Sequence, residues 1–182
     1  MHQHLGIQEH ASLLFEFGSQ NNQGYWSTQD VVNHTLNSAI KIFEAVYPGY
    51  QGLFLYDNAS SHSSYADDAL RVQNMNLGSG GEQAVLRDGY FIKNGVQTIQ
   101  KMVNNEGIPK GIEEYCEDCK PFLGSKCLTC ETISSSCGES CCARRILSQQ
   151  DDFQQQKGKL QEMIELTGHK IMFYPKFLCK LN

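Results

Sequence analysis

The pattern of hydrophobic and polar positions divides the first third of the chain into a strand, a helix and a second strand. Residues 13–17 form a short apolar run that ends at a glycine and a polar loop, as a buried strand does. Apolar residues then recur at helical spacing over 32–46, after a capping box that opens at Ser27. Residues 52–57 are apolar on both faces, which is typical of a strand covered on both sides in a parallel sheet. Strand, helix and strand in this order predict a βαβ unit.

The pattern weakens over residues 58–111 and returns in the last third of the chain. The middle stretch carries a Ser-rich turn, Gly-rich loops and short apolar pieces, and it predicts no clear element. A polar helix is expected from about residue 142 to Gly168, because its apolar residues share one stripe and a glycine stands where the helix ends. Residues 169–174 predict one more strand. An α/β sheet interrupted by an insertion accounts for this pattern most simply.

The insertion is marked by cysteines, because seven of the eight lie within residues 116–142. Two Cys-x-x-Cys pairs come first: Cys116 with Cys119, and Cys127 with Cys130. Each pair lets two thiolates reach one zinc ion at about 2.3 Å, and two pairs complete a tetrahedral site. The gap between the pairs is short for a zinc ribbon, so three further cysteines stay open as alternative ligands: Cys137, Cys141 and Cys142. The prediction is a structural Zn²⁺ in a knuckle-like segment over residues 112–145, with reduced structural thiols as the competing interpretation.

Charge and the first residues bear on compartment and partners. Lys and Arg number 15 against 20 Asp and Glu, a formal net charge of -5, which disfavours a domain that holds a polyanion by charge alone. Residues 1–10 are polar and His-rich and lack the basic and apolar stretches of a secretory signal. We therefore expect an intracellular protein without a membrane partner, and clustered thiolates rather than a disulfide framework.

One carboxylate stands at a position suited to chemistry. Asp57 closes the apolar run of residues 52–56, and working groups in open α/β sheets sit at the carboxyl ends of strands. The competing interpretation is structural: Asp57 and Asn58 form an Asx turn as the chain leaves the sheet.

The wider sequence around Asp57 carries a family resemblance. Residues 53–62 (LFLYDNASSH) resemble the second acidic motif of the DDE superfamily endonucleases, the mariner-type transposases and their relatives, in which a strand ends in Asp-Asn-Ala with a His a few residues on. Residues 170–182 resemble the segment just before the family's third carboxylate. Shorter segments are similar to a divergent, transposon-derived branch: 17–26, 66–70, 75–81, 87–89 and 141–145.

The resemblance implies a fold and a cellular setting. Members have a ribonuclease-H-like mixed sheet with flanking helices, here spread over residues 1–182 as a single partial domain that the Cys-rich segment interrupts. They are parts of transposable elements, act on DNA and work in the nucleus. The oligomeric state and the DNA target stay open.

The resemblance also implies a chemistry for Asp57. Family members cleave and join DNA strands with two Mg²⁺ ions held by three carboxylates, which suits a hard cation and an in-line displacement. Asp57 matches the second carboxylate, and His62 is a second candidate that positions a metal or a phosphate. The first carboxylate would precede Leu13 and the third would follow Asn182. We therefore expect an endonuclease fragment that is catalytically incomplete as it stands.

Other charged residues are weaker candidates. Three acids occur at no motif position and are expected to be surface or capping groups: Glu16, Asp30 and Asp88. Arg144 and Arg145 follow the last cysteines of the cluster and are candidate phosphate contacts, with a solvated helix turn as the simpler interpretation. The alternative function class is a non-catalytic zinc-knuckle module that binds protein or nucleic acid on an α/β scaffold.

Overall fold

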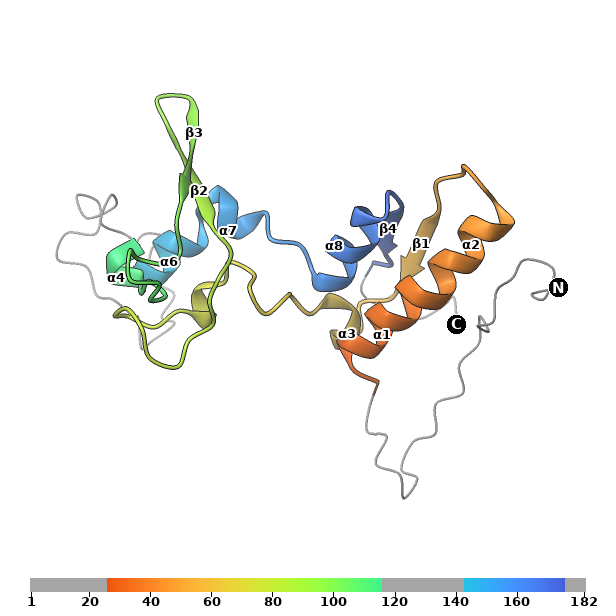
Figure 1. Cartoon of the computed structure of the whole chain (residues 1–182), viewed down its shortest axis with the longest axis horizontal. Helices are drawn as coiled ribbons and strands as arrows, with labels where there is room; N and C mark the ends of the chain where they lie inside the picture. The colour runs from red at the N-terminus through yellow and green to blue at the C-terminus, as the bar shows by residue number, and fades with distance from the viewer. Residues whose placement is uncertain (1–25, 116–142, 176–182) are drawn as a thin grey trace, which may run out of the picture. The chain divides into compact units, whose positions relative to one another are not determined.

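The computed structural model describes residues 26–115 and 143–175, which fall into two compact units with separate hydrophobic cores (Figure 1). Unit one holds the described residues up to Ala66 and from Lys157 onward. Unit two comprises those between Asp67 and Gln156. The sequence had suggested one domain interrupted over residues 112–145. In the structure, the segment that separates the two parts of unit one is longer and carries a core of its own.

One long helix opens unit one, built from α1 (Thr28–His34), a π-helical turn η2 (Thr35–Ile40) and α2 (Lys41–Val46). The predicted capping box is confirmed: the Ser27 hydroxyl accepts from the Asp30 amide at 3.2 Å, and the Asp30 carboxylate accepts from the Ser27 amide at 2.9 Å. Two of the first orphan amides are thereby satisfied. The expected role of Asp30 as a capping group is confirmed with it.

Two parallel strands pack against this helix. β1 (Leu53–Tyr56) pairs with β4 (Lys170–Phe173) in parallel, with Leu53 opposite Lys170. α8 (Lys159–Leu166) precedes β4, and Gly168 follows its C-cap Thr167 with a φ of 83°, the left-handed conformation predicted for a helix end. The core of this unit joins both helices: Val31, Val32, Ile40, Leu160 and Ile164.

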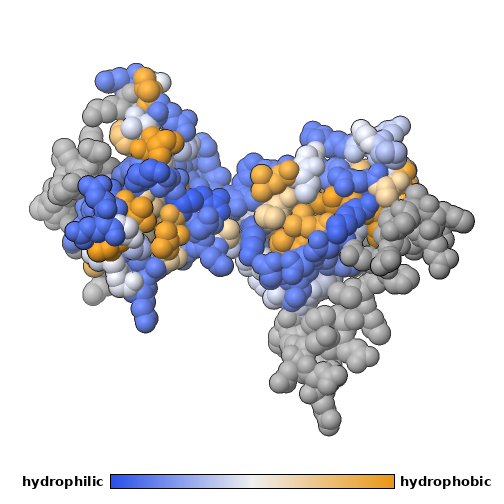
Figure 2. Space-filling model, in the orientation of Figure 1, coloured by the Kyte–Doolittle hydropathy of each residue, from blue (hydrophilic) through white to orange (hydrophobic). Residues whose placement is uncertain are grey.

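One face of this sheet carries apolar side chains that reach the surface. Phe54 and Ile171 point into the core, whereas Leu53, Leu55 and Met172 are 56%, 44% and 50% exposed. Within residues 26–115 and 143–175, β1 is therefore covered on one face, where the sequence predicted cover on both. The physical reason is that the described helices of unit one pack on the Phe54 face. Apolar side chains appear at the surface of both units (Figure 2).

Unit two contains an antiparallel hairpin of β2 (Gly89–Lys93) and β3 (Val96–Gln100). Asn94 and Gly95 form its two-residue loop with φ of 52° and 78°, the positive values that a twisted hairpin needs. The hairpin projects away from short helices at its base (Figure 1). These are η3 (Val72–Asn74), α4 (Ile112–Tyr115), α6 (Ala143–Ser148) and α7 (Asp151–Gln154).

The helix predicted from residue 142 to 168 is wrong as one element. The chain forms α6, α7 and α8, with extended backbone at Gln150 and at Gly158. Asp152 explains the first interruption, because its side chain is buried and bonded to another element and so cannot face solvent on a regular helix. The strand predicted for residues 169–174 is confirmed as β4. In the described parts of the chain, no helix is long and apolar enough to cross a membrane.

The fold class is thus mixed α/β, with one small parallel pair and one antiparallel hairpin among the described residues. Parallel pairing joins residues that are far apart in the sequence, as the β1–β4 register shows. This pairing places the carboxyl ends of β1 and β4 side by side, and Asp57 follows directly there.

Candidate functional site

The candidate site lies where β1 ends and the chain turns into α3 (Ser60–Ser63). The amide of Tyr174 donates to the carbonyl of Tyr56 at 2.8 Å, so the two strand ends stay paired up to this point. The side-chain amide of Asn58 then donates to the carbonyl of Tyr174. The turn after Asp57 is therefore anchored to the neighbouring parallel strand.

Asp57 also forms the predicted Asx turn. Its Oδ1 accepts from the amide of Ala59 at 3.0 Å, two residues further along the chain. The structural and the functional interpretations of this residue are compatible, because Oδ2 accepts no hydrogen bond from any described residue. The side chain is 65% exposed, so this second oxygen is open to a ligand.

His62 lies beside this carboxylate. Its Nδ1 is 2.6 Å from Asp57 Oδ1, and its ring meets the edge of Tyr56 with 5.1 Å between ring centroids. A carboxylate only accepts, so Nδ1 of His62 donates this hydrogen bond. Tyr56 is held in turn by Thr35, whose hydroxyl is 2.6 Å from its own. The structure thus brings both predicted residues of this site, Asp57 and His62, together.

The electrostatics of the site keep the acid ionised. The hydrogen bond from the Ala59 amide, with smaller contributions from His62, lowers the pKa of Asp57 below its ordinary value. Burial raises the pKa of Tyr56, so that phenol stays protonated at neutral pH. The site therefore presents one anionic oxygen beside a hydrogen-bonded imidazole.

The described residues fit one ligand position of a magnesium site. Asp57 supplies a hard oxygen of the kind that Mg²⁺ prefers. Among the described residues, however, no group of three or more His, Cys, Asp or Glu side chains could hold a metal ion. The two-metal clamp implied by the resemblance is thus not assembled in the described part of the chain. The predicted zinc ligands between Cys116 and Cys142 lie outside it.

The two arginines lie in the other unit. Arg144 is half-buried on α6 and donates to the carbonyls of Val72 and Met75, the latter at 3.0 Å. This guanidinium therefore connects α6 to the η3 segment, and Arg145, the next residue of α6, is exposed. Their contact with phosphate stays a prediction.

The sequence did not predict two hydrogen bonds at the site. Asn58 ties the turn to β4, and Thr35 fixes Tyr56 from the π-helical turn. Asn58 stood within the motif, but the backbone carbonyl that it contacts depends on the parallel pairing. Of the acids outside the motif, Asp88 has the expected structural role, since it pairs with Lys101 and accepts from the amide of Met102.

Comparisons with family models, curated proteins and solved structures give no match for this chain. The function therefore has to be argued from the motif and from the geometry around Asp57. That geometry consists of a parallel strand end, an Asx turn and a histidine that faces the carboxylate.

Proposed function

We propose that this chain is part of a DDE-type catalytic domain, the kind that cleaves and joins DNA strands with two bound metal ions. Asp57 would be its second carboxylate. The observation that carries the proposal is the position of Asp57 directly after the carboxyl end of β1, beside the parallel strand β4. Ligands and metals in open α/β sheets are bound at this end of the strands.

The local order of elements supports the proposal. A strand ends at the Asp-Asn-Ala turn and His62 follows a few residues on, which is the order that the resemblance implies; in the structure the strand is β1 and His62 belongs to α3. A ribonuclease-H-like sheet would continue from the β1–β4 pair. The proposal depends on this parallel pairing. An Asp57 on an exposed antiparallel hairpin would argue against a ribonuclease-H-like sheet.

Each residue of the site has a distinct part in this proposal. Asp57 would bind a divalent cation through Oδ2, because Oδ1 is engaged by Ala59 and His62. His62 is a positioning residue: its hydrogen bond orients the carboxylate and holds it ionised. Asn58 fixes the turn against β4. None of these groups replaces the further carboxylates that a two-metal displacement needs.

We therefore expect that the chain by itself binds a divalent cation weakly and does not turn over DNA. The direct test is an NMR titration of the isotope-labelled full chain with Mn²⁺, whose unpaired electrons broaden nearby signals. Broadening is expected around residues 57–62. It should disappear in Asp57→Asn and persist in Asp67→Asn, a matched control at another exposed acid.

Two results would count against the proposal. Equal broadening in wild type and Asp57→Asn would remove Asp57 as a metal ligand. Metal-dependent nicking of plasmid DNA by the purified chain, abolished by Asp57→Ala, would instead show that its site is complete.

A further inference from the structure

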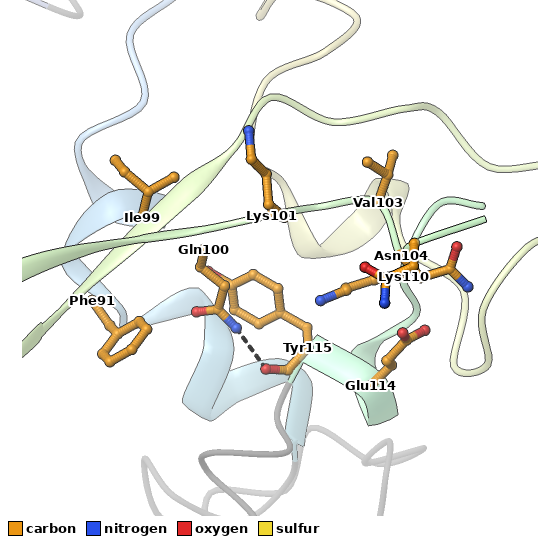
Figure 3. Close-up of a pocket in the computed structure, with 10 residues that line it drawn as sticks. Phe91, Ile99, Gln100, Lys101, Val103, Asn104, Lys110, Glu114 and Tyr115 are labelled. Atoms are coloured by element: carbon orange, nitrogen blue, oxygen red, sulfur yellow. Dashed lines mark hydrogen bonds between the residues drawn. The ribbon is translucent and has the colours of Figure 1, made fainter. Parts of the chain in front are cut away.

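Unit two contains a pocket that the proposed function does not use. It has a volume of about 600 Å³ and lies between the end of β3, the following loop and α4 (Figure 3). This volume is within the range of sites that bind small molecules. Its back wall is fixed, because Tyr115 donates its hydroxyl to the buried Asp152 at 2.9 Å and its carbonyl accepts from Gln100 at 2.8 Å.

The pocket has an apolar end and a polar end. Phe91 lies at one end, and Asn104, Lys110 and Glu114 lie at the other (Figure 3). An apolar body of a ligand packed on the half-buried Phe91 ring would remove apolar surface from water.

Most polar groups around the pocket already form hydrogen bonds or ion pairs within the protein. Lys110 and Glu114 are the two with a charged atom that no described residue contacts in this way. Lys101 pairs with Asp88, and Oδ1 of Asn104 accepts from the amides of Glu106 and Ile108. The ammonium group of Lys110, by contrast, forms no hydrogen bond or ion pair with any described residue.

Glu114 is the other open group. One of its carboxylate oxygens accepts from the hydroxyl of Ser79, and no described residue donates to the second. Lys110 and Glu114 line the same pocket, yet they form no ion pair with each other. Lys110 has no described partner for its charge and Glu114 keeps one oxygen open, so a ligand with opposite charges would add a charge-assisted hydrogen bond to each.

The charges select the class of ligand. Lys110 and Glu114 sum to zero, so a polyanion such as a nucleotide would meet the repulsion of Glu114. A molecule with one positive and one negative group satisfies both side chains. We propose that this pocket binds a zwitterionic amino acid with an apolar or aromatic side chain. Its carboxylate pairs with Lys110, its ammonium pairs with Glu114, and its side chain packs on Phe91.

The test is calorimetric or NMR titration of the full chain with L-phenylalanine. Saturable binding is expected at millimolar concentrations or below. The matched probes are 3-phenylpropionate, which lacks the ammonium, phenethylamine, which lacks the carboxylate, and glycine, which lacks the apolar body. Each should bind about tenfold more weakly or worse, which corresponds to the loss of one contact.

Variants locate the site. Lys110→Met and Glu114→Gln should each weaken phenylalanine binding by about tenfold, and Phe91→Ser should weaken it as well. Phe91 lies on the hairpin and outside the core cluster of unit two, so that variant keeps the core intact. Lys41→Met, at an exposed lysine of unit one, should bind as the wild type does.

Three outcomes would overturn the inference. They are the absence of phenylalanine binding at millimolar concentration, equal binding of the singly charged analogues, and tighter binding of adenosine monophosphate than of phenylalanine. None of them depends on Asp57, so the result is separate from that of the Mn²⁺ titration.

Discussion

At the residue scale, the carboxylates of this chain are distinguished by what donates to them. Asp57 receives a backbone amide and an imidazole and keeps one oxygen open. Asp152 is 1% exposed, and its oxygens accept from Tyr90, Tyr115 and Phe153. An acid with every oxygen engaged stabilises the fold, whereas an acid with a free oxygen is available for ligands.

The pH dependence of Asp57 follows from its donors. Its pKa is lowered in the folded chain, so the turn is stabilised above the ordinary carboxyl pKa, and this contribution is lost as pH falls through the lower folded value. Ala59→Pro removes the amide that contributes most, and Ala59 already has a φ of -60° that proline accepts. We expect the pKa of Asp57, measured by NMR, to rise in this variant and to rise less in His62→Ala. The pKa of Asp30 is the internal control and should not move.

Asp152 permits a stability test in unit two. Asp152→Ala leaves the Tyr115 hydroxyl and the Tyr90 amide without their acceptor, so the free energy of unfolding should fall by about 3 kcal/mol. Asp151→Ala is the matched control at the exposed neighbour and should change it by less than about 0.5 kcal/mol. Urea denaturation measures both. Equal losses of unfolding free energy in the two variants would show that the buried hydrogen bonds of Asp152 do not contribute to stability.

At the element scale, local signals specify where helices and turns begin and end. The Ser27 capping box opens the first helix, and Asn94-Gly95 closes the hairpin with both φ values positive. An Asn-Gly pair between apolar runs is a strong hairpin signal, and the sequence analysis missed it. The continuous helix expected up to Gly168 failed because Asp152 and the extended backbone at Gly158 belong to tertiary contacts that periodicity does not contain.

Gly168 tests the helix end directly. Its φ of 83° disfavours any side chain, and a Cβ there would meet no atom within 4 Å, so the cost of Gly168→Ala is purely a backbone cost. We expect a loss of about 1 kcal/mol in the free energy of unfolding. Gly158→Ala is the control, since its φ is -64° and its nearest contact would be an ordinary 3.5 Å. The prediction fails if the control loses as much.

At the scale of the whole molecule, two cores divide the chain. Unit one joins residues on both sides of unit two, so the parallel pair β1–β4 forms only when distant parts of the chain meet. The candidate carboxylate belongs to unit one and the amino-acid pocket to unit two. Each proposal can therefore be tested without disturbing the core that carries the other.

The zinc prediction concerns cysteines outside the described residues, so it is tested on the full chain. Protein purified under reducing conditions should carry about one zinc per chain, because the folded chelate binds tightly at neutral pH. Replacing Cys116 and Cys119 with serine should lower this content, whereas Cys179→Ser, remote from the cluster in the sequence, should not. Metal analysis by mass spectrometry measures the stoichiometry. Protein without zinc under these conditions would contradict the prediction of a zinc site.

The sequence by itself determined what depends on neighbours along the chain. These features are the capped helix, the strands around Phe54 and Ile171, and the position of Asp57 at a strand end. They rest on helical and strand periodicity and on capping, which act over a few residues.

Tertiary structure alone decided which strands pair, which sheet face stays exposed and where the last helix breaks. It also placed Lys110 and Glu114 in one pocket with Phe91 and Gln100 of the hairpin. These outcomes depend on burial and on hydrogen-bond partners distant in sequence, and no local pattern of residues encodes which distant groups will meet.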